Sequence, residues 1–252
     1  MNSASYEIPG ELIIALRNAK YVAVLTGAGI SAESGIPTFR DAQVGLWAQY
    51  DPEDLATPDA FARDPRLVWE WYAWRRSLVE QAQPNPGHLA LAEMERRVPQ
   101  FTLITQNVDG LHRRAGSKHV LELHGNITRV KCSVEQIFVE DWPATSDVPP
   151  RCPQCLAMLR PAVVWFGERL PEQENREAFT AAAECDLFLS IGTSALVQPA
   201  ASLPRVAQRS GASVAIINPD SAAQRYPGAY SVEGPAGEVL PALLKAVWPD
   251  LP

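Results

Sequence analysis

The chain has 252 residues, 46% of them hydrophobic, which is enough for one large domain or for a core with a smaller lobe. Its formal net charge is −7, its sequence pI is about 5.2, and no run of Lys or Arg forms a basic footprint, so DNA and RNA are disfavoured as partners. No run of about 18 apolar residues and no secretory signal pattern occurs, so we expect a cytoplasmic protein without a membrane partner.

The first predicted elements are a helix over about Glu11–Ala19 and a buried parallel strand over Tyr21–Leu25. The strand runs into GAGISA at 27–32, which fits the G-x-G-x-x-[G/A] turn that directs backbone N–H groups toward a pyrophosphate. A tight strand-to-helix turn that serves packing alone is the alternative.

The helix after this turn is expected to be short. Gly35 and Pro37 end it early, whereas a dinucleotide dehydrogenase usually continues into a long helix. Arg40 then follows on a loop beside the expected phosphate site. A dinucleotide held there faces a reactive site instead of lying flat against a sheet.

A helix is also predicted to begin at Asp64-Pro65, because Asp is a preferred cap and Pro a preferred first helical residue. On this helix Tyr72 and Arg75 project together, three residues apart, from a half-buried face. An Arg that snorkels from an amphipathic helix is the ordinary explanation of such a position.

Helices and strands then alternate along the chain. The predicted elements are a helix at Pro86–Arg97, strands at Thr102–Thr105 and near Val120–Leu123, a helix at Glu172–Glu184, a strand at Asp186–Ile191, a helix at Pro199–Ser210 and a strand at Ser213–Asn218. This alternation predicts an α/β fold with a Rossmann-like, doubly wound parallel sheet.

Two segments do not fit the alternation, and we expect them to form a second, smaller lobe of a single domain. One is the mostly helical stretch 41–83, and the other is the ribbon-like stretch 125–165, which is rich in Pro and Cys. The larger lobe then comprises about 1–40, 84–124 and 166–252.

Polar residues follow the strand that ends at Thr105, namely Gln106, Asn107 and Asp109. Carboxyl ends of parallel strands line the ligand crevice of open α/β sheets. An Asx turn that caps the next helix suits Asn107 and Asp109 equally well. His124 ends the next strand-like run; a lone His is more often structural, but its near-neutral pKa also suits a general base at a sugar hydroxyl.

The chain has four cysteines, of which Cys152 and Cys155 form a Cys-x-x-Cys pair. In a reducing compartment this pattern indicates metal or redox chemistry rather than a disulfide framework. Cys185 lies at a predicted helix-to-strand junction and is expected to be an ordinary buried thiol.

Six motifs in chain order together resemble the sirtuins, which are NAD-dependent protein-lysine deacylases. They are TGAGISAESGIPTFR at 26–40, TQNVDGLH at 105–112, LHG at 123–125, VVWFGE at 163–168, IGTSALVQPA at 191–200 and INPD at 217–220. The resemblance covers the chain from about Glu11 to Lys245, and the ordered set is far more specific than any one motif.

The resemblance implies that NAD is a co-substrate and that acylated lysines of peptides or proteins are the partners. The acyl oxygen attacks the ribose carbon as nicotinamide leaves, and His124 deprotonates a ribose hydroxyl, giving nicotinamide, 2′-O-acyl-ADP-ribose and free lysine. Asn107 is the second implied catalytic residue. The implied NAD-binding residues are Gly27, Ala28, Gly29, Ala32, Phe39, Arg40, Gln106, Asn107, Asp109, Gly192, Thr193, Ser194, Asn218, Asp220 and Ala236. The implied peptide clamp consists of Phe166, Gly167 and Val197 on two extended segments.

Tyr72 and Arg75 occupy the place of a Tyr-x-x-Arg pair that resembles the class III sirtuins. In that class the pair binds the distal carboxylate of succinyl-, malonyl- or glutaryl-lysine. A phenol and a guanidinium at the end of an apolar tunnel favour an anionic acyl group by charge-assisted hydrogen bonds of about 1.5–3 kcal/mol each. The resemblance therefore implies desuccinylation alongside deacetylation.

The chain departs from the sirtuins at their zinc site, which usually has two Cys-x-x-Cys pairs. Cys152 and Cys155 are present, but the first pair is Cys132-Ser-Val-Glu135, so the fourth cysteine is missing. Two outcomes are open. Zinc binds to three thiolates with Glu135, a nearby residue or water as the fourth ligand, or the lobe folds without metal.

Two functions other than deacylation stand as alternatives. A nicotinamide-dependent dehydrogenase needs a hydride acceptor site, which nothing in the sequence supplies. The other is a protein that senses NAD or ADP-ribose without turnover, or that transfers ADP-ribose to proteins. His124 distinguishes a deacylase from a sensor, and we expect a monomer in either case.

Overall fold

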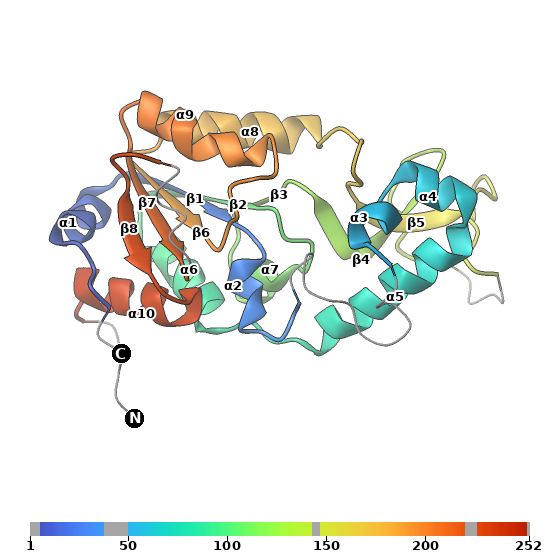
Figure 1. Ribbon diagram of the computed structural model, residues 1–252, viewed down its shortest axis with the longest axis horizontal. Helices are drawn as coiled ribbons and strands as arrows, with labels where there is room; N and C mark the ends of the chain where they lie inside the picture. The colour runs from blue at the N-terminus through green and yellow to red at the C-terminus, as the bar shows by residue number, and fades with distance from the viewer. Residues whose placement is uncertain (1–5, 38–49, 143–146, 220–225, 251–252) are drawn as a thin grey trace.

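A six-stranded, wholly parallel sheet forms the larger part of the molecule (Figure 1). Its strands are β1 (Tyr21–Thr26), β2 (Gln100–Thr105), β3 (Val120–Glu122), β6 (Leu187–Ile191), β7 (Ser213–Asn218) and β8 (Tyr230–Glu233). The order across the sheet is β3-β2-β1-β6-β7-β8. The predicted α/β fold with a doubly wound parallel sheet is confirmed.

The computed structural model describes residues 6–37, 50–142, 147–219 and 226–250. The predicted cofactor residues Phe39, Arg40 and Asp220 lie outside these ranges. Among the described helices, none combines the length and the apolarity needed to cross a membrane.

Helices cover both faces of the sheet (Figure 1). One face carries α1 (Gly10–Asn18), α6 (Pro86–Arg97) and α10 (Ala236–Val247); the other carries α8 (Glu172–Glu184), the 3-10 turn η2 (Ala200–Ser202) and α9 (Leu203–Arg209).

Strand β1 shows how the sequence produces these two layers. Val22 and Val24 lie in the core beneath α1, α6 and α10, whereas Ala23 and Leu25 lie in the core beneath α8 and α9. Successive strand residues face opposite sides, so a strand covered on both faces needs a continuous apolar run.

The smaller lobe lies beyond one end of the sheet (Figure 1). It contains helices α3 (Pro52–Leu55), α4 (Pro58–Arg63) and α5 (Pro65–Gln81) and the antiparallel strands β4 (Gly125–Cys132) and β5 (Leu159–Val163). The predicted start of α5 is confirmed, because the Asp64 side chain accepts a hydrogen bond from Leu67 N at 3.0 Å and Pro65 is the first helical residue.

Most of the predicted elements are confirmed, but one predicted helix differs and two observed elements were not predicted. The helix expected at Pro199–Ser210 divides into η2 and α9, while β8 and α10 were not predicted at all. Helix α10 contains Gly237 and Pro241, which both disfavour a helix. It forms nevertheless because one face, which includes Leu240 and Leu243, is fully buried.

The order of the strands reverses beside β1. The chain passes from β1 outward through β2 and β3, then crosses to the other side of β1 and continues through β6, β7 and β8. Loops that leave the carboxyl ends on either side of such a reversal diverge and form a crevice. The short helices α2 (Gly29–Ala32) and α7 (Leu111–Arg114) lie at this edge (Figure 1). The described candidate cofactor and catalytic residues at the carboxyl ends of β1, β2, β3, β6 and β7 therefore share it.

Candidate active site

The glycine turn after β1 packs directly against the glycine turn after β6. Gly29 N donates to Gly192 O at 2.9 Å, and Gly27 N donates to Ile191 O at 3.0 Å. A Cβ on Gly27 would lie 2.7 Å from Gly192 O, and one on Gly29 would lie 2.7 Å from Gly192 Cα. Close packing therefore requires glycine at both positions. The N–H groups of Gly27 and Gly29 already donate to backbone carbonyls and are not free for a pyrophosphate. Ala28 is half-buried and Ala32 is exposed at the same turn.

Asn107 and Asp109 form one buried polar cluster with Ser31. Ser31 Oγ donates to Asp109 Oδ2 at 2.8 Å, and Asn107 Nδ2 donates to Ser31 Oγ at 3.1 Å and to Gly27 O at 3.0 Å. Asp109 Oδ1 also accepts from Leu111 N at 2.9 Å, so the Asx turn forms at Asp109. Asn107 instead ties the turn after β2 to the turn after β1. Burial raises the pKa of Asp109.

Two buried histidines beside this cluster were missed as site residues. His112 Nε2 lies 2.9 Å from Thr26 Oγ1, His88 Nε2 lies 3.5 Å from Ser31 Oγ, and the two rings are 4.8 Å apart. Burial lowers the pKa of His88 to about 4 and that of His112 well below 6.5, so both are neutral at pH 7. The motif that contains Asn107 also contains His112, but no pattern marks His88.

His124 follows β3, and its Nδ1 lies 3.0 Å from Gln106 O. A carbonyl only accepts, so Nδ1 carries the proton and Nε2 keeps the basic lone pair. Burial lowers the pKa of His124 below 6.5, and the bond to Gln106 O opposes this only in part. The ring is therefore neutral at pH 7, as a general base must be. Gln106 orients it through the backbone.

The turn after β6 is braced by neighbouring polar groups. Ser190 Oγ and Thr193 Oγ1 are 3.0 Å apart, and Asn218 Nδ2 donates to Thr193 O at 3.0 Å. Ser194 is exposed. Ala236 is buried in the first turn of α10, so its side chain offers a ligand little surface.

Tyr72 and Arg75 lie one turn apart on the inner face of α5. The Tyr72 ring is 4.6 Å from the Trp71 ring and 6.4 Å from the Trp165 ring, and the Arg75 guanidinium carbon lies 5.3 Å from the centre of Trp71. Burial raises the pKa of Tyr72 and lowers that of Arg75, which still keeps its charge at neutral pH. A phenol that donates and a guanidinium thus share one largely buried aromatic patch.

Phe166 and Gly167 are the two middle residues of a β-turn, so the expectation that they lie on an extended segment is wrong. Glu168 N donates to Trp165 O at 3.0 Å, and Gly167 has a φ of +88°. A left-handed residue at the third position is typical of a type II turn and favours Gly. Phe166 is 45% exposed at the tip. Val197 lies half-buried in the loop after β6.

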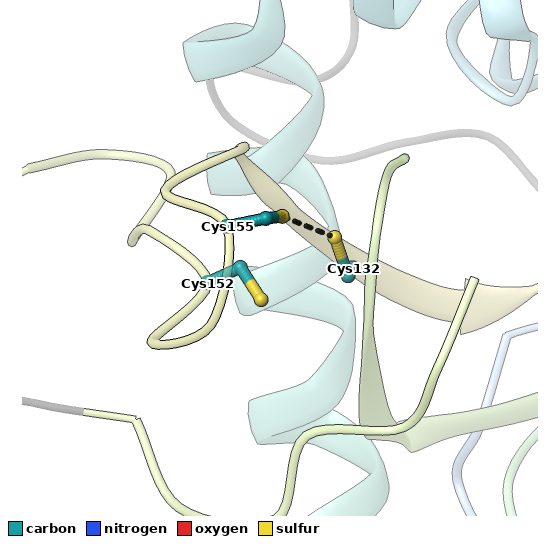
Figure 2. A group of neighbouring side chains, drawn as sticks. All are labelled: Cys132, Cys152 and Cys155. Atoms are coloured by element: carbon teal, nitrogen blue, oxygen red, sulfur yellow. Dashed lines mark hydrogen bonds between the residues drawn. The ribbon is translucent and has the colours of Figure 1, made fainter. Parts of the chain in front are cut away.

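Cys132, Cys152 and Cys155 gather at one end of the β4–β5 ribbon (Figure 2). Their Sγ atoms all lie within 4.8 Å of one another, and those of Cys132 and Cys155 are 3.4 Å apart. Backbone N–H groups of Cys155 and Gln154 lower the pKa of Cys152, which favours the thiolate. Sulfur atoms bound to one zinc at about 2.3 Å are spaced by about 3.8 Å, so the three thiols fit a zinc ion.

Two matching turns carry these cysteines. Gln136 N donates to Cys132 O at 3.1 Å and Leu156 N donates to Cys152 O at 2.9 Å, with left-handed φ values of 57° at Gln136 and 62° at Leu156. Glu135 therefore occupies in the first turn the position that Cys155 occupies in the second. Its side chain is exposed and its amide donates to Cys132 Sγ at 3.4 Å.

The comparisons with known proteins agree with this site. A sequence profile described as the Sir2 family matches residues 27–199. A protein of Pseudomonas aeruginosa named NAD-dependent protein deacylase 1 is 53% identical over 242 residues, which cover 93% of this chain and 97% of that protein.

Two solved structures share the fold closely. A Sir2 homologue in complex with NAD has a TM-score of 0.88 at 48% identity, covering 96% of this chain and 94% of that one. A mutant Sir2 homologue in complex with 2′-O-acetyl ADP ribose has a TM-score of 0.87 at 47% identity, covering 95% of this chain and 96% of that one. Because the Sir2 family profile matches more than half of this chain, the chain belongs to the Sir2 family.

Proposed function

We propose that this chain is an NAD-dependent protein-lysine deacylase that removes acetyl groups and also succinyl or malonyl groups. The observation that carries the proposal is the geometry of His124, a neutral base whose tautomer is fixed by Gln106 O at the carboxyl edge of the sheet. The names of the relatives support the reaction class.

The residues divide the work along the crevice. The turns at Gly27–Ala32 and Gly192–Ser194 are expected to hold the dinucleotide, together with Asn218 at the end of β7. When bound, NAD supplies the ribose carbon that the acyl oxygen attacks as nicotinamide leaves. Asn107 and Asp109 are held by hydrogen bonds with Ser31, and we expect them to line the nicotinamide side of the crevice.

His124 then removes a proton from a ribose hydroxyl through Nε2. The hydroxyl oxygen attacks the acyl carbon, and one water supplies the new carbonyl oxygen as the carbon–nitrogen bond to lysine breaks. The products are 2′-O-acyl-ADP-ribose, nicotinamide and free lysine. Because Nδ1 stays bonded to Gln106 O, the ring keeps its orientation when Nε2 gains the proton.

Nicotinamide release by the wild-type protein tests the function. With NAD alone release should be negligible, and acetyl-lysine and succinyl-lysine peptides should each start it, with the deacylated peptide formed in equal amount. Liquid chromatography with mass spectrometry measures both products. Release without peptide, or ADP-ribosylated protein in place of deacylated peptide, contradicts the proposal in favour of a transferase, and binding without turnover favours a sensor.

We also propose that zinc is held by Cys132, Cys152 and Cys155, with Glu135 or water completing the site. A structural zinc would tie the two turns together and so fix the β4–β5 ribbon. A carboxylate is an acceptable zinc ligand, and Glu135 has the same position in its turn as Cys155 has in the other, which supports it as the fourth ligand.

Metal analysis of the purified protein should find about one zinc per chain. Glu135→Ala should release zinc to a chromogenic chelator faster than wild type, and Glu135→Cys should release it more slowly, since thiolate is the stronger ligand. Glu140→Ala, which removes another exposed carboxylate of the same lobe, is the matched control and should behave as wild type. A protein that folds without metal overturns this site.

Four properties stay predictions from the sequence. They are the cytoplasmic location, the monomeric state and the absence of nucleic-acid and of membrane partners.

A further inference from the structure

Arg160, a buried arginine of β5, binds the β-turn that contains Phe166. Arg160 is 4% exposed, and its guanidinium binds Glu168 through two bonds, Nη1 to Oε1 at 2.5 Å and Nη2 to Oε2 at 2.9 Å. Nη2 also donates to Val163 O at 3.0 Å. The guanidinium carbon lies 3.3 Å from the centre of the Trp165 ring.

The Glu168 carboxylate also binds the first residue of the β-turn. Glu168 Oε2 accepts from Trp165 N at 2.9 Å, in addition to the backbone bond from Glu168 N to Trp165 O. Burial alone would raise the pKa of Glu168, but the hydrogen bonds from Arg160 and Trp165 N lower it overall, so the carboxylate stays ionised. Both ends of the turn are therefore fixed by one ion pair.

The turn Trp165–Glu168 lies beside three residues in the helical part of the smaller lobe. The Trp165 ring lies 6.4 Å from the Tyr72 ring and 5.2 Å from the Phe61 ring. Phe166 N donates to Ala56 O at 2.9 Å, which docks the turn on the loop between α3 and α4. A shift of the turn would thus move the aromatic wall beside Tyr72 and the exposed Phe166 together.

A buried ion pair contributes little net stability compared with apolar residues of similar volume, because both charges lose their hydration. A guanidinium fork, such as that of Arg160, that binds both oxygens of one carboxylate does fix the relative position of the two side chains. The placement of this pair under the turn is consistent with such a positioning role.

We propose that Arg160 and Glu168 are positioning residues of the acyl-peptide subsite, which set the turn Trp165–Glu168 so that Phe166 and Gly167 meet the peptide and Trp165 backs the acyl pocket. The proposal rests on the proposed function. It assigns no contact between Arg160 and the substrate, since Arg160 acts through Glu168 and Trp165.

Glu168→Gln and Arg160→Lys test this role, because each keeps the side chain's length and polarity but removes the two-bonded fork. The dissociation constant of an acetyl-lysine peptide, measured by calorimetry, and the peptide KM should both rise about tenfold, while kcat and the KM for NAD stay within about twofold of wild type. The double variant should bind the peptide no more weakly than the weaker-binding of the two single variants, because the two residues form one interaction.

Glu70→Gln is the matched control, since it breaks the exposed Arg66–Glu70 pair of the same lobe and should leave every constant unchanged. If the fork serves stability alone, thermal unfolding temperatures fall while peptide affinity is kept, and the proposal is overturned. Calorimetry separates the two proposals. A wild type that binds peptide tightly without turnover contradicts the deacylase function only, and the variants' weaker binding still decides the role of Arg160.

Discussion

His124→Ala should lower the formation of deacylated peptide by about 10²- to 10⁴-fold, the usual contribution of a positioned general base. The substitution removes the Nε2 lone pair, and it leaves the turns at Gly27 and Gly192 untouched. Binding of ADP-ribose should therefore stay close to wild type. Mass spectrometry of the peptide measures turnover, and calorimetry measures binding.

His119→Ala is the matched control for this change, because His119 is an exposed histidine immediately before the same strand, β3. It should have wild-type turnover and binding. Retained turnover in His124→Ala would show that another group is the base, and lost ADP-ribose binding would assign His124 to the cofactor site instead.

Protonation of His124 should determine how kcat/KM falls at low pH. His124 works only when neutral, and burial lowers its pKa below 6.5. As the pH falls, kcat/KM of the wild type should therefore decline with a midpoint below pH 6.5, because His124 is protonated only there. A midpoint above pH 7 contradicts a neutral, buried His124.

Arg75→Met should lower kcat/KM for a succinyl-lysine peptide by about 10- to 100-fold and change that for an acetyl-lysine peptide by less than about threefold. Only the succinyl group has a distal carboxylate for the guanidinium, and Met keeps much of the apolar contact that Arg75 makes beside Trp71. Nicotinamide release with paired peptides of one sequence measures the ratio.

Arg76→Met is the matched control for selectivity. Arg76 is the next residue of α5, but its Nε donates to Ile127 O at 3.0 Å and its guanidinium lies over Trp69. Its loss should affect both peptides alike. Equal losses with Arg75→Met as well would leave the anionic acyl preference without support.

The sequence predicted the sheet well because the strands are strongly apolar and the helices between them have clear ends. Helix α6 begins at Pro86 after its Asn85 cap, and α8 begins at Glu172 after Pro171, as local signals indicate. The end of the chain was harder. Helix α10 depends on burial against the sheet, which outweighs the local cost of Pro241.

The sequence offered candidate site residues where a motif marks them, but it did not predict the contacts between them. Ser31, Asn107 and His88 belong to separate loops and helices, so no local pattern predicts that they meet in one buried cluster. The role of Arg160 was hidden for a similar reason, since its fork becomes visible only once Glu168 folds back onto β5.

The strand order beside β1 also determines when each neighbour of β1 becomes available during synthesis on the ribosome. Strand β1 pairs with β6, and Leu187 lies 165 positions after its partner Val22, whereas the nearer neighbour β2 begins at Gln100. At about 5–20 residues per second, a ribosome completes β6 many seconds after β1. Until then the nascent chain holds β1, β2 and β3 with one face of β1 and its hydrogen-bonding edge uncovered. The nascent larger lobe is therefore expected to need protection from aggregation before the second half of the sheet arrives.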